Sequence, residues 1–238
     1  MKKNYFPIKG FLPVTLLDWP GKIAAMIFVS GCNFRCQFCY NTELVLHPEK
    51  IPDISQEKIF KHLLIKKKWI DGLVISGGEP TLHKGLIDFC QEVKNLGYKI
   101  QIQTNGTNPE VLQKLIDKKL IDCLAMDIKA PFEKYELITQ TKVNTKNIAK
   151  SIQIIEKNPQ IEAEFRTTII PKFLTKNDII KISKMLSKNK RPYFIQQFQN
   201  KKTLNKKLIG TNSYLNKDLE KIIKSAQKYK KEIKLRGV

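Results

Sequence analysis

Three cysteines within eight residues have the types and spacing to bind a metal centre. Cys32, Cys36 and Cys39 form a C-x3-C-x2-C pattern directly after the apolar run 24–29. Thiolates are the ligands of iron–sulfur clusters, and a cubane cluster usually takes four protein ligands. Three ligands leave one iron open, so that it can bind a cosubstrate directly. The alternative is a structural zinc site completed by His47 or His83, although the spacing fits paired zinc ligands poorly.

A second motif, Gly77-Gly78-Glu79-Pro80, follows the next apolar run along the chain. Glycines let a ligand approach the backbone closely, and the Glu79 carboxylate could receive an ammonium group. Taken alone, this motif is an ordinary tight turn. Its position one strand after the cysteines makes a ligand-binding role the better interpretation.

Both motifs fall at the ends of predicted strands. Six strand-like runs alternate with helical patterns, and they span residues 24–29, 73–76, 99–104, 123–128, 163–170 and 193–198. Such alternation predicts right-handed crossovers and a parallel sheet. Six units are fewer than the eight of a closed barrel, so we predict an α/β fold, a single-domain partial (β/α)6 TIM-like barrel. Chemistry in these folds gathers at the carboxyl ends of the strands, where both motifs lie.

The charge of the chain is strongly positive but is poor in arginine. The formal net charge is +21, yet only four of the 43 basic residues are arginines. Proteins that read bases or clamp phosphates favour arginine. The lysine excess therefore indicates a codon bias more than nucleic-acid binding, and a zinc-stabilised nucleic-acid-binding module is the weaker alternative. From Lys172 onward the net charge is +15, which keeps a basic docking surface open as an interpretation.

The remaining features of the chain favour a cytoplasmic protein without a membrane partner. The first residues lack an apolar signal core, and no run approaches the roughly 18 apolar residues of a membrane span. Five cysteines are too few and too unevenly placed for a disulfide scaffold. Cys90 and Cys123 stand alone in apolar contexts, so we predict that they are small buried hydrophobes.

The combination of the two motifs resembles the radical S-adenosylmethionine superfamily. Cys32, Cys36 and Cys39 match its cluster ligands, with Phe38 before the third cysteine. The resemblance implies a [4Fe-4S] cluster on these cysteines and S-adenosylmethionine held by Gly77, Gly78, Glu79 and Pro80. It further implies oxidoreductase chemistry, in which one electron cleaves the cosubstrate to a 5′-deoxyadenosyl radical.

Other motifs resemble one branch, the glycyl-radical-enzyme activases, and within it the anaerobic ribonucleoside-triphosphate reductase activating proteins. They are Pro20-Gly21-Lys22, Thr104-Asn105-Gly106, the stretch 125–129 (AMDIK), the stretch 164–168 (EFRTT) and Gln196-Gln197-Phe198. The resemblance implies cofactor-binding roles for Thr104, Asn105, Asp127, Lys129 and Arg166. An ordinary strand-end ion pair is the alternative for Asp127 and Lys129. The expected partners are a glycyl-radical enzyme as protein substrate, the anaerobic reductase first, and a flavodoxin- or ferredoxin-type electron donor.

The resemblance runs from about Gly10 to Phe198, which predicts a core over residues 1–198 and a basic helical extension over 199–238 packed on it. Two positions depart from the branch. Tyr40 follows the third cysteine where activases commonly have histidine, and Gln103 replaces an aspartate that helps to hold a monovalent cation in the pyruvate formate-lyase branch. A small heterocyclic or nucleotide substrate, as in deazaguanine synthases, is the alternative function, but the AMDIKAP and EFRTT stretches argue against it.

Overall fold

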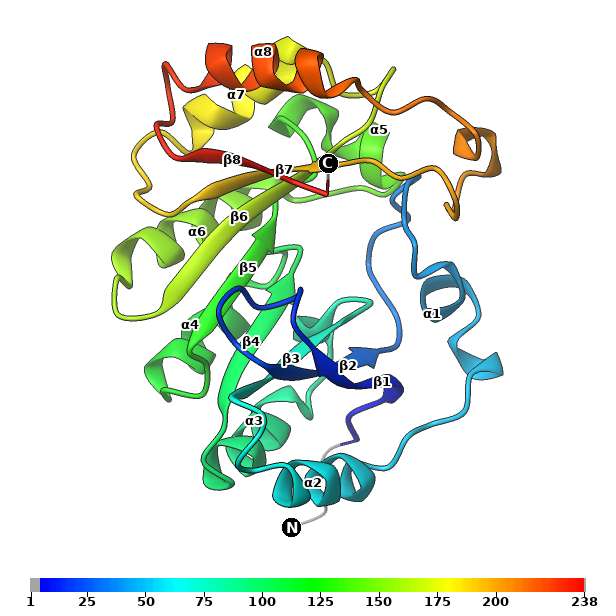
Figure 1. The fold of residues 1–238 in the computed structure, drawn as a ribbon, viewed down its shortest axis with the longest axis vertical. Coiled ribbons are helices and arrows are strands. Elements are labelled where there is room, and N and C mark those ends of the chain that lie inside the picture. The colour runs from blue at the N-terminus through cyan, green and yellow to red at the C-terminus, as the bar shows by residue number, and fades with distance from the viewer. Residues whose placement is uncertain (1–4, 238) are drawn as a thin grey trace.

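The computed structural model describes residues 5–237 as a curved sheet with helices on its outer side (Figure 1). The strands are β1 (Ile8–Thr15), β2 (Ala24–Val29), β3 (Gly72–Gly77), β4 (Lys99–Thr104), β5 (Cys123–Asp127), β6 (Glu162–Ile169), β7 (Tyr193–Gln197) and β8 (Ile233–Arg236). The helices are α1 (Thr42–Leu46), α2 (Gln56–Ile65), α3 (Leu86–Asn95), α4 (Pro109–Asp117), α5 (Tyr135–Thr139), α6 (Thr145–Lys157), α7 (Lys176–Met185) and α8 (Asn216–Ala226). None of these helices is long and apolar enough to cross a membrane.

The order of the strands in the sheet is their order in the chain, from β1 to β8. The strands β2 to β8 are all parallel, and β1 pairs antiparallel with β2. Within residues 5–237 the two edges, β1 and β8, do not pair with each other, so the barrel stays open. The predicted partial barrel with a parallel sheet is therefore confirmed, and all six predicted strands are present as β2 to β7.

The strands β1 and β8 were not predicted, because the sequence of each lacks a typical strand pattern. Pro13 lies within β1, where its missing N–H is tolerated because β1 is an edge strand. The strand β8 has four residues, two of them charged, and pairs in parallel with β7. Residues after 198 thus contribute both the helix α8 and the last strand of the sheet.

Alternate residues of each strand divide the core into two parts. One set packs against the helices, as Ile27 and Ile75 do in the main core. The other set faces the inside of the barrel, where Trp19 packs with Met26, Val74 and Cys123. Ala24, Gly72 and Cys123 are the first residues of their strands, so this apolar plug fills the amino end of the barrel. The carboxyl end of the interior is left to polar side chains.

Candidate active site

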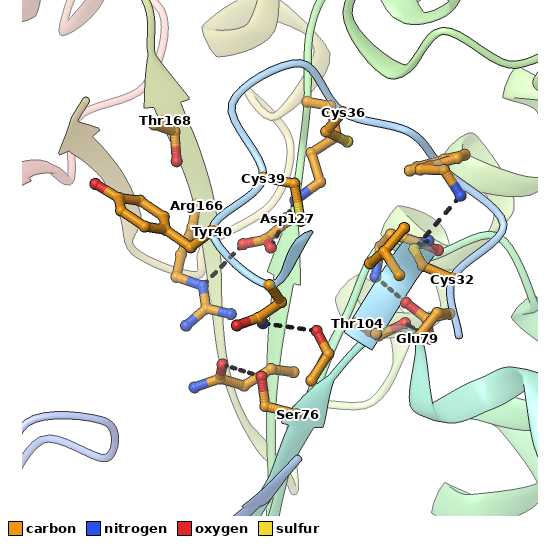
Figure 2. Close-up of a pocket in the computed structure, with 18 of the residues that line it drawn as sticks. Cys32, Cys36, Cys39, Tyr40, Ser76, Glu79, Thr104, Asp127, Arg166 and Thr168 are labelled. Atoms are coloured by element: carbon orange, nitrogen blue, oxygen red, sulfur yellow. Dashed lines mark hydrogen bonds and ion pairs between the residues drawn. The ribbon is translucent and has the colours of Figure 1, made fainter. Parts of the chain in front are cut away.

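The segment 30–41, here called the cysteine loop, connects β2 to α1. It borders a cavity of about 290 Å³ at the carboxyl ends of the strands (Figure 2). Gly31, near the start of this loop, has a φ of +73° that favours glycine, and its N–H donates to the Leu44 carbonyl at 2.9 Å. Residues from five strands and this loop surround the cavity, including Cys32, Cys36, Cys39, Tyr40, Asn41, Ser76, Gly77, Gly78, Glu79, Gln103, Thr104, Asn105, Asp127, Lys129, Arg166, Thr168 and Gln196. The structure therefore brings together every predicted site residue except Pro80, which begins the short 3₁₀ turn Pro80–Leu82.

The three thiols lie in a desolvated environment with a cation beside them. Burial raises the pKa of Cys32 to about 11 and that of Cys36 to about 12, and it also raises the pKa of Cys39. The Lys129 ammonium works in the opposite direction on all three. The Cys32 sulfur also accepts the Phe34 N–H at 3.4 Å. Without a metal these thiols hold their protons, so metal binding must release them.

The turn after β3 packs against the cysteine loop with no space for a side chain. The Gly78 N–H donates to the Val29 carbonyl and the Glu79 N–H donates to the Gly31 carbonyl, both at 2.8 Å. A Cβ on Gly78 would lie 1.6 Å from the Gly31 oxygen. Gly77 has a φ of +114°, and its carbonyl accepts the Asn41 side-chain amide at 2.9 Å. The two predicted motifs therefore form one backbone unit.

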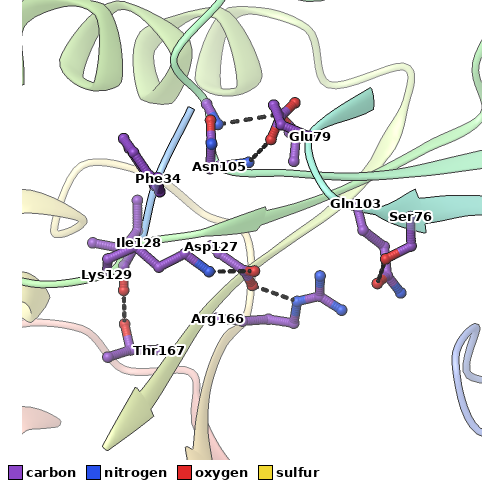
Figure 3. Close-up of polar contacts among 12 residues, drawn as sticks. Phe34, Ser76, Glu79, Gln103, Asn105, Asp127, Ile128, Lys129, Arg166 and Thr167 are labelled. Carbon is purple, nitrogen blue, oxygen red and sulfur yellow. Dashed lines mark hydrogen bonds and ion pairs between the residues drawn. The ribbon is translucent and has the colours of Figure 1, made fainter. Parts of the chain in front are cut away.

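The Glu79 carboxylate braces this unit to the loop after β4. Its Oε1 accepts hydrogen bonds from the Thr81 and Thr104 hydroxyls at 2.6 and 2.8 Å. Its Oε2 accepts the Asn105 N–H at 2.7 Å, and Figure 3 shows Glu79 beside Asn105. The side chain is 1% exposed, and burial raises its pKa above the usual range in spite of these donors. Glu79 thus has a structural task that the sequence did not indicate, and it holds Thr104 and Asn105 at the cavity.

Asp127, Lys129 and Arg166 form a charged triad on the cavity wall (Figure 3). The Lys129 ammonium lies 2.8 Å from Oδ2 of Asp127, and Nε of Arg166 lies 3.0 Å from Oδ1. Burial works to raise the pKa of Asp127, but its two cationic neighbours outweigh this and hold that pKa below its ordinary value. The strand-end ion pair considered from the sequence is present, and it lies inside the cavity. The triad has two cations and one anion, so it favours an anionic ligand group.

The triad continues into a network that the sequence did not predict. Arg236 in β8 binds Glu164 through two hydrogen bonds, at 2.7 and 2.9 Å, and its guanidinium stacks 3.8 Å above the Phe194 ring. Glu164 lies 3.9 Å from Arg166, and both side chains are 8% exposed. The last strand therefore restrains the position of a cavity residue through one buried carboxylate.

The cavity has further polar residues: Gln103 was singled out from the sequence, whereas Ser76 and Thr168 were not given a site role, although the strand periodicity contained a signal for both. Thr168 lies two residues after Arg166 on β6, so both side chains face the interior. Ser76 and Gln103 face the same side from β3 and β4, and the Ser76 hydroxyl donates to Gln103 Oε1 at 2.9 Å. The Gln103 amide oxygen thus already has a partner within the protein.

The histidines considered for a zinc site lie elsewhere. His83 contacts the Ser30 carbonyl through Nε2 at 2.8 Å, and His47 pairs with Glu49 at 3.5 Å. Neither borders the cavity. Across residues 5–237, no three His, Cys, Asp or Glu side chains converge on a point where one metal ion would bind. In a cubane cluster each thiolate binds a different iron, and three cysteines around one cavity suit that requirement.

Comparison with known proteins agrees with this geometry. The Radical SAM superfamily matches residues 26–186. The chain belongs to the radical SAM superfamily. A protein assigned as a glycyl-radical enzyme activating enzyme in Methanocaldococcus jannaschii is 34% identical over 235 residues, which cover 97% of this chain and 96% of that protein. The pyruvate formate-lyase-activating enzyme of Listeria monocytogenes is 32% identical over 142 residues, covering 54% of this chain and 55% of that enzyme.

The same fold is also found among solved structures. Streptococcus suis SuiB bound to the precursor peptide SuiA superposes with a TM-score of 0.66 at 16% identity, covering 89% of this chain and 48% of SuiB. The radical SAM family implies a [4Fe-4S] cluster and S-adenosylmethionine. The residues present fit both groups, because three cysteines, a glycine turn without space for side chains and a net cationic triad border one cavity.

Proposed function

We propose that this chain is an activase that cleaves S-adenosylmethionine reductively and installs a glycyl radical on a partner enzyme, anaerobic ribonucleoside-triphosphate reductase. The observation that supports this proposal most is the convergence of the cysteine loop, the glycine turn and the charged triad on one cavity (Figure 2). When bound, the cluster and S-adenosylmethionine supply a one-electron cleavage that yields methionine and a 5′-deoxyadenosyl radical.

Each part of the cavity has a role in this proposal. Cys32, Cys36 and Cys39 hold the cluster through their thiolates. The turn at Gly77 and Gly78 packs against the cysteine loop and borders the cavity, so the amino acid end of the cosubstrate would lie between this turn and the cysteines. The triad residues Lys129 and Arg166 then attract its carboxylate, and burial strengthens that attraction.

A polypeptide substrate suits the open edge of the sheet. Within residues 5–237 the barrel is not closed between β1 and β8, which leaves a side through which a loop of another protein can approach the cavity. A backbone glycine is a suitable hydrogen donor, because the flanking amides stabilise the resulting radical. The likeness to the Methanocaldococcus jannaschii activating enzyme over nearly the whole chain supports the same substrate class.

The test uses anaerobically reconstituted protein and a reductant. With S-adenosylmethionine it should release 5′-deoxyadenosine, and with the anaerobic reductase it should produce a glycyl doublet in electron paramagnetic resonance. A reductase variant with its radical glycine replaced by alanine is the matched control and should give no doublet. Release of 5′-deoxyadenosine stimulated only by a small heterocycle would contradict the activase proposal. A doublet on another glycyl-radical enzyme, but not on the reductase, would contradict the choice of partner.

A further inference from the structure

A basic loop lies against the outer side of the cysteine loop. The segment 199–211, here called the lysine loop, connects β7 to α8 and has four exposed lysines, at 201, 202, 206 and 207. The Asn205 N–H donates to the Gln37 carbonyl at 2.8 Å, and the Asn205 side chain donates to the Gln37 amide oxygen at 2.7 Å. Gln37 is the residue that follows Cys36. The lysine loop is therefore attached directly to the segment between two predicted cluster ligands.

A second contact joins the two loops on the other side of Cys39. The Tyr40 hydroxyl donates to the Gln199 carbonyl at 2.9 Å, while Tyr40 itself borders the cavity. This contact gives a role to the tyrosine that replaces the histidine common in activases. The Tyr40 side chain stays 40% exposed, and Ile209 on the lysine loop is 51% exposed. The surface formed by both loops thus combines positive charge with accessible apolar area.

The lysines are presented by an ordered segment. Thr203 and Leu208 are buried, and the Thr203 hydroxyl donates to the Asn205 carbonyl at 2.8 Å. The Asn200 side chain donates to the Thr211 carbonyl at 2.8 Å, which joins the two ends of the loop. A partner would therefore not have to immobilise a flexible linker to meet these charges.

The positive charge of the lysine loop is largely uncompensated. Lys202 lies 3.8 Å from Glu43, and both side chains are more than half exposed, so water and salt screen this pair. Within the described part of the chain, Lys201, Lys206 and Lys207 form no ion pair. Four cations on so short a segment raise the association rate constant of an anionic partner.

We propose that the lysine loop and Tyr40 form the docking surface for an acidic electron-carrier protein with a one-electron flavin or iron–sulfur centre. This inference rests on the proposed function, because the chemistry consumes one electron, which must enter at the cysteines. The carrier's centre is oxidised by one electron and the cluster is reduced by one, with no proton transferred. A carrier docked here would contact the segment that bears the cysteines, because the lysine loop is hydrogen-bonded to Gln37 and Tyr40. Small, weak interfaces are typical of such encounters.

The test compares two variants with the same change in charge. In the loop variant, Lys201, Lys202, Lys206 and Lys207 become glutamine. In the control variant, Lys114, Lys118, Lys146 and Lys157 become glutamine; these exposed lysines belong to α4 and α6 or follow α4 directly, on the opposite side of the molecule in Figure 1. Both variants and the unmodified chain are reconstituted anaerobically. The probes are a purified acidic ferredoxin, for binding and for reduction of the cluster, and dithionite as a small reductant.

The loop variant should bind ferredoxin about tenfold more weakly at low salt and should be reduced by it about tenfold more slowly. The control variant should change less than about twofold, and the differences should shrink as salt shortens the screening length. Dithionite should reduce all three proteins equally. Equal behaviour of the two variants toward ferredoxin would overturn the docking surface. The docking surface would also be overturned if the loop variant lost binding to a short single-stranded RNA but kept its binding to ferredoxin.

The docking surface and the proposed function fail in different ways. If dithionite gives no 5′-deoxyadenosine with any of the three proteins, the proposed function is refuted. The ferredoxin binding measurement needs no turnover and still decides the docking surface in that case. If dithionite supports cleavage in all three proteins, and ferredoxin binds and reduces all three equally, the proposed function stands and the docking surface is refuted.

Discussion

Replacement of Gly78 by alanine should disrupt the site through steric overlap alone. The added Cβ would lie 1.6 Å from the Gly31 carbonyl oxygen, whereas real Cβ atoms keep at least 3.0 Å from other atoms. The cysteine loop or the glycine turn must therefore move by more than an ångström. That movement also breaks the bond between the Glu79 N–H and the Gly31 carbonyl. Gly78 does not have a positive φ, so backbone strain plays no part in the effect.

The size of the effect follows from these contacts. Overpacking of a tight contact costs about 1–3 kcal/mol, and loss of the hydrogen bond adds about 1 kcal/mol. Together they lower the melting temperature of a chain of this size by roughly 5–15 °C. A misplacement of about 1 Å at a reacting centre costs about 100-fold in rate, so cleavage of S-adenosylmethionine should fall at least that far.

Gly31→Ala is the matched control, because it alters the other side of the same contact. Gly31 has a φ of +73°, but a Cβ there meets nothing within 4 Å. Its cost is backbone strain of about 1–2 kcal/mol without displacement of the turn. Calorimetry, iron and sulfide content and the rate of 5′-deoxyadenosine release should be measured for both variants. The reasoning is refuted if Gly78→Ala retains the rate of the unmodified chain, or if Gly31→Ala loses as much of it.

Three further predictions concern other parts of the chain. Alanine at Cys32, Cys36 or Cys39 should abolish iron and sulfide binding after reconstitution. Alanine at the buried Cys90 or Cys123 should preserve that binding and should lower the unfolding free energy by roughly 1 kcal/mol. Metal analysis and denaturant titration check both expectations, and loss of the cluster in Cys123→Ala would contradict the assignment. Arg236→Gln should raise the KM for S-adenosylmethionine about tenfold with a smaller change in kcat, because Glu164 then turns toward Arg166. Arg236→Lys should restore part of the lost affinity. An unchanged KM in Arg236→Gln would show that Arg236 does not position Arg166. Burial works to raise the pKa of Asp178, but hydrogen bonds from Lys134 and Thr175 outweigh it and hold that pKa below its ordinary value. The ionised form of Asp178 therefore stabilises the fold near neutral pH, and this stabilisation is lost as the pH falls through the depressed pKa. Asp178→Asn should therefore cost about 2 kcal/mol near pH 7, and urea titrations should show the difference from the unmodified chain shrinking below about pH 4; a constant difference would contradict this sign.

The central strands could be predicted because their sequences are apolar on both faces. The runs that form β2 and β3 are nearly continuous hydrophobic segments, which parallel strands with two buried faces require. The strand β1 contains Gly10 and Pro13, and β8 is short and charged, so neither has such a run. Both are edge strands, where pairing on one side is enough. Their presence depends on neighbours that are distant in the sequence, and local patterns do not reveal them.

The candidate site could be predicted as a set of residues but not as a set of contacts. The cysteines and the glycine turn have local spacings that point to their chemistry. The Glu79 carboxylate shows the limit of this reasoning, because its acidity suggested an ammonium partner while the fold supplies Thr81, Thr104 and Asn105 as donors. Arg236 and Glu164 are 72 residues apart, and nothing near either one indicates the other. Attachment of the lysine loop to Gln37 is likewise a product of the tertiary fold.

The agreement between strand order and chain order has a consequence for synthesis on the ribosome. Each new strand emerges next to the strand made just before it, so the sheet can grow in one direction without waiting for later segments. The cysteines and the glycine turn belong to the first third of the chain and can meet early. Arg166, in contrast, lacks its final restraint until Arg236 has been translated and β8 has paired with β7. A nascent chain can therefore display the cysteines well before the cavity beside them is fully shaped.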